Sequence, residues 1–241
     1  QGVAFVCKHM RKSGVIFMPV TTPQQKISKT KLFGGGWVEV RLVGDYFDDT
    51  LRASQTYCAE VGGHFLSPFD DLDVIEGQAT VTHELLEQLE GAPDILVVPV
   101  GGGGLSSSAR RLLMERAPDT EIFYVEPTGG KSLAAAVLAG EPTTIKNVDT
   151  FVDGAAVACI GKHTFAALKG IDADHVLAIP EDRICTTILE MLNVEGVVLE
   201  PAGALALDAL KDLKENIKGK TVVCVSSGGN FDFERLPEVK E

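Results

Sequence analysis

Short apolar runs alternate along most of the chain with longer segments in which apolar and polar residues are mixed at helical spacing. A short apolar run bounded by glycine or proline is typical of a strand that is buried on both faces. The pattern predicts strands at residues 15–18, 37–43, 64–66, 95–100, 122–125, 175–179 and 221–225. It predicts helices at residues 2–10, 47–61, 73–89, 133–139, 163–168, 183–192 and 202–213, and a further helix that starts near Leu105.

This alternation predicts an α/β fold, in which a mostly parallel sheet is covered by helices on both faces. A polar, turn-rich break at Pro68–Asp71 separates a small α/β domain, residues 1–68, from a larger one, residues 69–241. The first helical segment has no capping residue before it, and residues 231–241 are charged without a terminating element of their own. We therefore expect both domains to be partial, with the N-terminal part of the fold missing.

The composition is that of an ordinary globular protein, with 45% hydrophobic and 23% charged residues. The net charge of -12 weighs against nucleic acid or an anionic membrane as a partner. No apolar run reaches the ~18 residues that a membrane span requires. The five cysteines form no C-x-x-C pair, so we expect buried thiols in a reducing cytoplasm and no metal site.

The segment with the clearest chemistry is the apolar run 95–100, which leads directly into Gly101, Gly102, Gly103 and Gly104. Glycine lets the backbone approach a ligand closely and adopt a positive φ. The N–H groups at the start of the following helix are unpaired, and the helix dipole adds partial positive charge there. The segment therefore predicts an anion site, most naturally for a phosphate.

Two common phosphate motifs fit the spacing of these glycines poorly. A dinucleotide fingerprint that starts at Gly101 would need glycine or alanine at Ser106. This alternative stays open, because Glu126 ends the next strand about where a ribose-binding acid would lie. A P-loop is excluded, because Val125 stands where the first glycine of a motif ending at Gly130-Lys131-Ser132 belongs.

A second ligand-type turn, Cys-Val-Ser-Ser-Gly-Gly-Asn at residues 224–230, also follows a predicted strand. It should lie at the carboxyl edge of the sheet, where open α/β sheets bind ligands. Ser227 offers a hydroxyl, and Gly228 and Gly229 would let a flat ligand lie close to the backbone.

Several segments occur together in one order, and with the two turns they resemble threonine deaminases of the fold type II pyridoxal-phosphate enzymes, which are tryptophan synthase β-like. They are residues 1–4, 14–19, 23–26, 68–71, 100–105, 125–127, 151–156, 185–190, 200–204 and 227–230. The glycine tetrad and the Ser-Gly-Gly-Asn turn are typical of the superfamily, and Cys-Thr-Thr-Ile-Leu-Glu at 185–190 indicates threonine deaminase. The resemblance covers essentially all 241 residues and implies two open, mostly parallel sheets flanked by helices.

The resemblance implies roles for individual residues. Gly101, Gly102, Gly103, Gly104 and the Leu105 amide would hold the phosphate of pyridoxal 5'-phosphate, Ser227 would face the pyridine nitrogen, and the backbone of Gly154 would lie beside the ring. Glu126 lies where relatives carry a cation-binding acid, but Ser132 replaces the second acid. We therefore expect no divalent metal, and Glu126 as an ordinary strand-end acid remains an alternative.

The resemblance also implies the reaction: pyridoxal-phosphate-dependent deamination of L-threonine to 2-oxobutyrate and ammonia, the first step of isoleucine biosynthesis. An amino-acid substrate, L-threonine or L-serine, and a homodimer or homotetramer are expected of the intact enzyme. In the family the lysine that carries the cofactor lies upstream of the segment that matches Gln1, so this chain alone should be inactive.

Three alternatives remain open. A serine dehydratase or serine racemase shares the cofactor motifs, although residues 231–236 resemble the lead-in to the regulatory domain of longer threonine deaminases. The chain could also be a noncatalytic ligand-binding fragment, or a dinucleotide-binding domain. The cofactor that binds would separate these classes.

Overall fold

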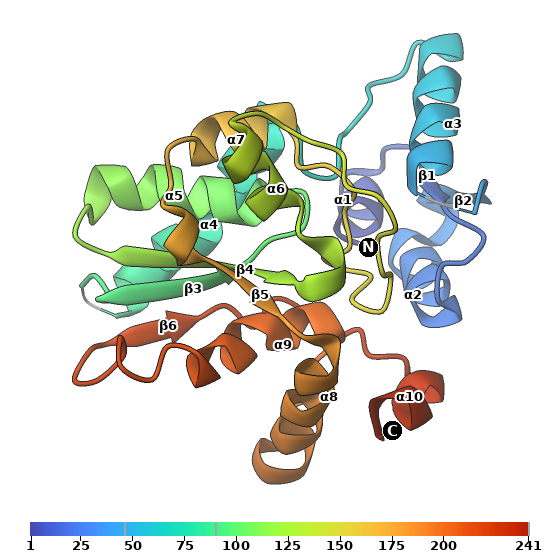
Figure 1. The fold of residues 1–241 in the computed structure, drawn as a ribbon. Coiled ribbons are helices and arrows are strands. Elements are labelled where there is room, and N and C mark those ends of the chain that lie inside the picture. The colour runs from blue at the N-terminus through green and yellow to red at the C-terminus, as the bar shows by residue number, and fades with distance from the viewer. Residues whose placement is uncertain (46, 90, 241) are drawn as a thin grey trace. The chain divides into compact units, whose positions relative to one another are not determined.

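Parallel strand pairs build both sheets of the chain, as the alternation of strands and helices predicts. The computed structural model describes residues 1–45, 47–89 and 91–240 (Figure 1). The chain divides into two compact units, Gln1–Leu66 and Ser67–Glu241.

The first unit has a parallel sheet of two strands. Strands β1 and β2 pair in register from Gly14 opposite Val38 to Met18 opposite Leu42. The elements are α1 (Gly2–Met10), β1 (Gly14–Met18), α2 (Gln24–Gly34), a 3-10 turn (Gly35–Trp37), β2 (Val38–Leu42) and α3 (Phe47–Glu60). The apolar pattern did not predict α2, because few of its residues are buried and much of its surface is polar.

The short strand predicted at residues 64–66 is wrong, because these residues have no regular structure. In the described part of the first unit, the sheet contains β1 and β2 alone. A strand exists only through the ladder of hydrogen bonds to a neighbour, and apolar character cannot replace that neighbour. Leu66 is accordingly 44% exposed.

The second unit is built on a fully parallel sheet with the strand order β5-β4-β3-β6. Its strands are β3 (Ile95–Pro99), β4 (Glu121–Pro127), β5 (Val176–Ile179) and β6 (Val222–Cys224). Its helices are α4 (Leu72–Gln88), α5 (Gly104–Arg116), α6 (Ser132–Ala139), α7 (Lys162–Leu168), α8 (Glu181–Glu190), α9 (Pro201–Asp208) and α10 (Leu236–Lys240).

Helices cover both faces of this sheet, which confirms the predicted fold class (Figure 1). Ile95 and Val97 of β3 pack on one face with the apolar residues of α8 and α9. Leu96 and Val98 point to the other face, where α5, α6 and α7 supply the neighbours. All of β3 is buried, so its continuous apolar run is that of a strand in the middle of a parallel sheet.

Three details at the C-terminal end of the chain differ from the expectation. Helix α8 continues into a π-helical turn, Met191–Glu195, and α9 ends at Asp208 before a 3-10 turn. The expectation that residues 231–241 contain no element is wrong, because α10 lies there. Phe231 and Val239 are each only 4% exposed and join the core beside α8, a contribution that the high charge of this segment conceals.

All five cysteines are free, and each is half-buried rather than fully buried as expected. Across residues 1–45, 47–89 and 91–240, no group of three or more His, Cys, Asp and Glu side chains could hold a metal ion. In the same ranges, no helix has both the length and the apolar character needed to cross a bilayer.

Candidate functional site

The four glycines connect the buried strand β3 to α5. Gly103 is the N-cap residue of α5, with a φ of 91° that side-chain-bearing residues rarely adopt. Gly102, Gly103 and Gly104 are buried, and Gly101 is half-buried. The backbone conformation therefore requires glycine at position 103.

Neighbouring side chains fill the space that a Cβ on this loop would need. A Cβ built on Gly102 would lie 2.1 Å from the ring of Phe69, and one on Gly103 would lie 2.9 Å from the Cβ of Thr164. A Cβ on Gly101 would lie 3.1 Å from the Cα of Ala155. The loop is thus held by close packing against the rest of the second unit.

The backbone N–H groups of this loop are unpaired. Before the loop, Val100 N–H donates to Val125 O at 2.8 Å, and after it, Ser107 N–H donates to Gly103 O at 2.9 Å. Between these bonds, no described residue accepts a hydrogen bond from the N–H groups of residues 102–106. A row of orphan amides at the positive end of a helix dipole is a site for an anion.

The serines in the first turn of α5 do not satisfy these amides. The hydroxyls of Ser106, Ser107 and Ser108 instead donate backwards, to the carbonyls of residues 103, 104 and 105, at 2.7 to 3.3 Å. Side-chain capping, the usual alternative to a ligand at a helix start, is therefore absent from the described part of α5.

Gly154 lies next to this loop, in an exposed turn. A Cβ on Gly101 would lie 3.3 Å from the carbonyl oxygen of Gly154. A Cβ on Gly154 would lie 2.9 Å from that of Ala202, in the first turn of α9. The structure therefore brings Gly154 between the glycine loop and the start of α9.

Ser227 reaches the same edge of the sheet from β6. Strand β6 pairs with β3 up to Val97 opposite Cys224, so both strands deliver their following turns to the same edge. The Ser227 side chain is exposed, and its hydroxyl is 3.5 Å from the carbonyl oxygen of Ala202. Gly154 and Ser227 thus both lie beside Ala202 at the start of α9, and Gly101 lies beside Gly154, while Leu105 lies in the first turn of α5.

Glu200 is a neighbour of this site to which the sequence assigned no role. It is the N-cap residue of α9, and its Oε1 would lie 2.0 Å from a Cβ on Gly228 and 3.7 Å from one on Gly154. Its backbone N–H donates to Gly228 O at 3.0 Å. The glycine at position 228 therefore makes room for a carboxylate beside Ser227.

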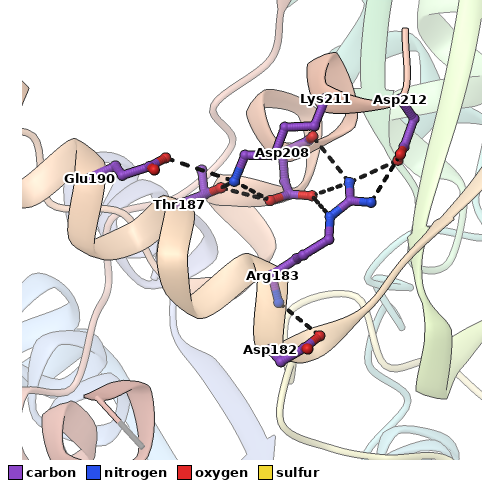
Figure 2. A network of polar contacts seen from close by, with 7 residues as sticks. All are labelled: Asp182, Arg183, Thr187, Glu190, Asp208, Lys211 and Asp212. Atoms are coloured by element: carbon purple, nitrogen blue, oxygen red, sulfur yellow. Dashed lines mark hydrogen bonds and ion pairs between the residues drawn. The ribbon is translucent and has the colours of Figure 1, made fainter.

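A network of charged groups fixes α9 against α8, as Figure 2 shows. The carboxylate of Asp208, at the end of α9, accepts hydrogen bonds from Arg183, from Thr187 Oγ1 at 2.7 Å and from Lys211 Nζ at 3.0 Å. Asp208 is completely buried. Burial alone would raise its pKa, but the bonds from Thr187, Arg183 and Lys211 outweigh burial and hold the pKa below the usual range.

Glu126 binds the start of α6. It is completely buried, and its two oxygens accept the N–H groups of Leu133 at 2.6 Å and Ala134 at 2.9 Å, at the start of α6. Burial raises the pKa of Glu126 to about 7, although the two amides and Lys131 act in the opposite direction. This carboxylate anchors a helix, and in that position it does not offer its oxygens to the ribose of a dinucleotide.

The chain matches a known protein family, and it is similar along its whole length to proteins that have names. The sequence profile described as "Pyridoxal-phosphate dependent enzyme" matches residues 1–228. The chain is 47% identical over 241 residues to a protein of Bacillus subtilis (strain 168) named "L-threonine dehydratase biosynthetic IlvA". That match includes 100% of this chain and 57% of the relative, so the chain spans little more than half of the relative's length.

Solved structures of similar proteins have the same fold, and two of them serve as examples. The processed form of threonine deaminase isoform 2 from Solanum lycopersicum gives a TM-score of 0.90 at 35% identity, covering 100% of this chain and 65% of that one. Maize serine racemase gives a TM-score of 0.86 at 26% identity, covering 99% of this chain and 73% of that one.

The loop at Gly101–Gly104 suits the phosphate of the cofactor that the family uses. Its N–H groups are unpaired among the described residues, its Cβ positions are filled by neighbours, and it opens a helix of 13 residues. A doubly charged phosphate needs several donors of this kind and gains from the helix dipole. From its sequence and its fold, the chain belongs to the family of pyridoxal-phosphate-dependent enzymes.

Proposed function

We propose that the protein containing this chain deaminates L-threonine to 2-oxobutyrate and ammonia with pyridoxal 5'-phosphate, and so acts in isoleucine biosynthesis. The observation that carries the proposal is the row of unpaired N–H groups at residues 102–106, which matches the anionic end of this cofactor. The likeness to the Bacillus relative across the whole chain supports the choice of substrate.

The proposed site divides the recognition of the cofactor among three elements. The amides of Gly101–Leu105 would bind the phosphate, and the exposed backbone of Gly154 would let the ring lie close. Bound pyridoxal phosphate supplies an electron-withdrawing ring that stabilises negative charge on the α-carbon of the substrate. Ser227 would offer the ring nitrogen a neutral hydroxyl, which, unlike a carboxylate, need not keep that nitrogen protonated. This arrangement suits elimination better than transamination.

A serine dehydratase or serine racemase is the second candidate. The likeness to maize serine racemase extends over 99% of this chain, so the fold supports either chemistry. Sequence identity supports the first candidate, because it is 47% to the Bacillus threonine dehydratase and 26% to maize serine racemase. We therefore rank threonine above serine.

The intact protein is also proposed to work as a homodimer or homotetramer in the cytoplasm, with an amino acid as its small-molecule partner. Light scattering on the purified protein measures its mass directly. A single protomer mass at micromolar concentration would contradict the proposed assembly.

The test uses the full-length gene product, loaded with pyridoxal phosphate and given L-threonine or L-serine. We expect 2-oxobutyrate from threonine at a higher kcat/KM than pyruvate from serine, with no D-serine formed. Faster turnover of serine, or formation of D-serine, would favour the second candidate. Failure to bind pyridoxal phosphate, with or without binding of a nicotinamide dinucleotide, would overturn the proposal.

A further inference from the structure

We propose that Thr164 is a positioning residue that aims the N–H of Gly103 at the cofactor phosphate, and that the Phe69-Asp70 turn holds Thr164 and the loop in place. This inference rests on the proposed function and deepens it, because it identifies what shapes the anion site. Neither the pattern of the sequence nor the resemblance assigns a role to Thr164.

Thr164 is completely buried in α7, and its hydroxyl lies against the glycine loop. Thr164 Oγ1 is 2.8 Å from the carbonyl oxygen of Gly102, and 3.0 Å from that of Gly161 in its own helix turn. The N–H of Gly161 also donates to Gly102 O, at 3.3 Å. Two donors from the start of α7 therefore hold one carbonyl of the loop.

The direction of that carbonyl sets the direction of the next N–H. A peptide unit is planar, and in the trans form its C=O and N–H point in opposite directions. The described chain has no cis peptide bond. Because the Gly102 carbonyl points at Thr164, the Gly103 N–H points away from α7, and no described residue accepts it there.

Such an anchor is needed because this peptide joins two glycines. With no Cβ on either side, a Gly–Gly peptide can rotate between orientations at little steric cost. Packing restrains the loop further, because a Cβ on Gly103 would lie 2.9 Å from Thr164 Cβ. The Thr164 hydroxyl gives the shorter of the two hydrogen bonds that distinguish one peptide orientation from its reverse, 2.8 Å against 3.3 Å from Gly161 N–H. The Thr164 methyl group cannot replace it, because a methyl group neither accepts nor donates a hydrogen bond.

The turn at Phe69 and Asp70 fixes both partners. The Asp70 carboxylate accepts the N–H of His163 at 2.7 Å and of Thr164 at 3.3 Å, so it holds the turn from which the Thr164 hydroxyl projects. The Phe69 ring lies against Gly102. The sequence predicted a domain boundary at this turn. In the structure the turn packs against the glycine loop through Phe69 and against the start of α7 through Asp70.

The test compares Thr164→Val, which removes the hydroxyl at constant shape, with Thr164→Ser, which keeps the hydroxyl. Equilibrium dialysis measures the Kd of the full-length apoprotein for pyridoxal phosphate and for pyridoxal, which lacks the phosphate. We expect Thr164→Val to weaken pyridoxal phosphate binding about ten-fold, equivalent to ~1.4 kcal/mol, and pyridoxal binding less than about two-fold. Thr164→Ser should bind both compounds like the wild type.

Thr120 offers a matched control. Thr120 immediately precedes β4. Its buried hydroxyl donates to the backbone carbonyl oxygen of Pro93 at 2.7 Å, a bond of the same kind as that from Thr164 Oγ1 to Gly102 O. Thr120→Val should lower the melting temperature without changing the ratio of the two dissociation constants. If Thr164→Val does not fold, Thr164→Ala removes the same hydroxyl with a smaller side chain and should give the same ratio.

Two outcomes would overturn the proposal: unchanged affinity for pyridoxal phosphate in the variant without the hydroxyl, or an equal loss for both compounds. The second outcome would make Thr164 a purely structural residue. Failure of the wild type to bind pyridoxal phosphate would instead contradict the proposed function. A phosphate-specific loss that Thr164→Ser does not show would support the proposal.

Discussion

The ring of Phe69 occupies the space that a side chain at Gly102 would need. A Cβ built on Gly102 would be 2.1, 2.2 and 2.4 Å from three ring carbons, closer than any real contact. The absence of a side chain at Gly102 therefore serves packing inside the protein. Glycine at position 102 is therefore needed for two separate reasons: the packing of the Phe69 ring and the proposed close approach of a ligand to the backbone.

Replacing Gly102 with valine should displace Phe69 and disturb the loop while β3 remains in place. We expect a loss of ~1–3 kcal/mol in the free energy of unfolding, the usual cost of overpacking, and a larger relative loss of pyridoxal phosphate affinity. Urea unfolding and equilibrium dialysis measure the two effects. Gly77→Ala in α4, where a Cβ would meet nothing within 4 Å, is the control and should bind the cofactor normally. A folded Gly102→Val variant with wild-type affinity would refute the role of this loop.

The loop could be predicted from the sequence because its elements are contiguous. A buried strand, four glycines and a helix start follow one another at residues 95–105, so local rules suffice. Ser227 could be singled out from the turn that follows a predicted strand, but its role came from the resemblance, as did Gly154 itself, because only the folded chain brings both residues to the start of α9.

Thr164 gave no local signal, and Phe69 was noted only as part of the segment at residues 68–71, without a role at the glycine loop. Each is an ordinary residue whose importance comes from a contact with a glycine that is distant in the sequence. The wrong strand at residues 64–66 has the same origin. Its apolar pattern is correct, but a strand also depends on a partner strand, which the pattern does not contain.

Ser227→Ala should lower turnover far more than it lowers stability. Ser227 is an exposed residue, and its hydroxyl makes only a long hydrogen bond of 3.5 Å to Ala202 O, so the fold should lose less than ~0.5 kcal/mol without it. The adjacent exposed Ser226 provides the control as Ser226→Ala. Turnover of threonine is measured at saturating cofactor. Equal activity in the two variants would exclude a role for the Ser227 hydroxyl at the ring nitrogen.

Glu126 should make the protein less stable as the pH rises. Its pKa in the folded chain is raised from 4.5 to about 7, so between these values the folded state holds a proton that the unfolded state has lost. The stability that protonated Glu126 contributes is therefore fully present below pH 4.5, and it is lost progressively as the pH rises from 4.5 to about 7. The total change is on the order of 3 kcal/mol.

Glu126→Gln tests this pH dependence, because glutamine keeps the size but does not titrate. The wild type should exceed the variant in stability most clearly near pH 5 and progressively less towards pH 8, by urea unfolding at each pH. A difference that grows with pH would mean that the amides of Leu133 and Ala134 stabilise the carboxylate more than burial destabilises it.

Asp208 should be the most sensitive member of the charged network in Figure 2. Asp208→Ala leaves the guanidinium of Arg183 and the ammonium of Lys211 without their buried partner, and should cost about 3 kcal/mol of unfolding free energy. Asp212 also binds Arg183, at 2.8 and 2.9 Å, but its side chain is 40% exposed. Asp212→Ala should therefore cost less than about 1 kcal/mol.

The pH dependence of the stability lost in Asp208→Ala shows whether the loss comes from the missing negative charge or from the missing side-chain volume. Because its folded pKa lies below the ordinary 3.8, its contribution is present above 3.8 and is lost as the pH falls through the folded value. The deficit of Asp208→Ala, measured by urea unfolding, should thus be constant from pH 8 to pH 5 and shrink in stronger acid. A deficit that stays constant to the lowest pH at which the wild type folds would mean that lost packing, and not the lost carboxylate, destabilises the variant. In that case α8 and α9 would be joined by their apolar contacts alone, and the ion pairs of Arg183 would add little.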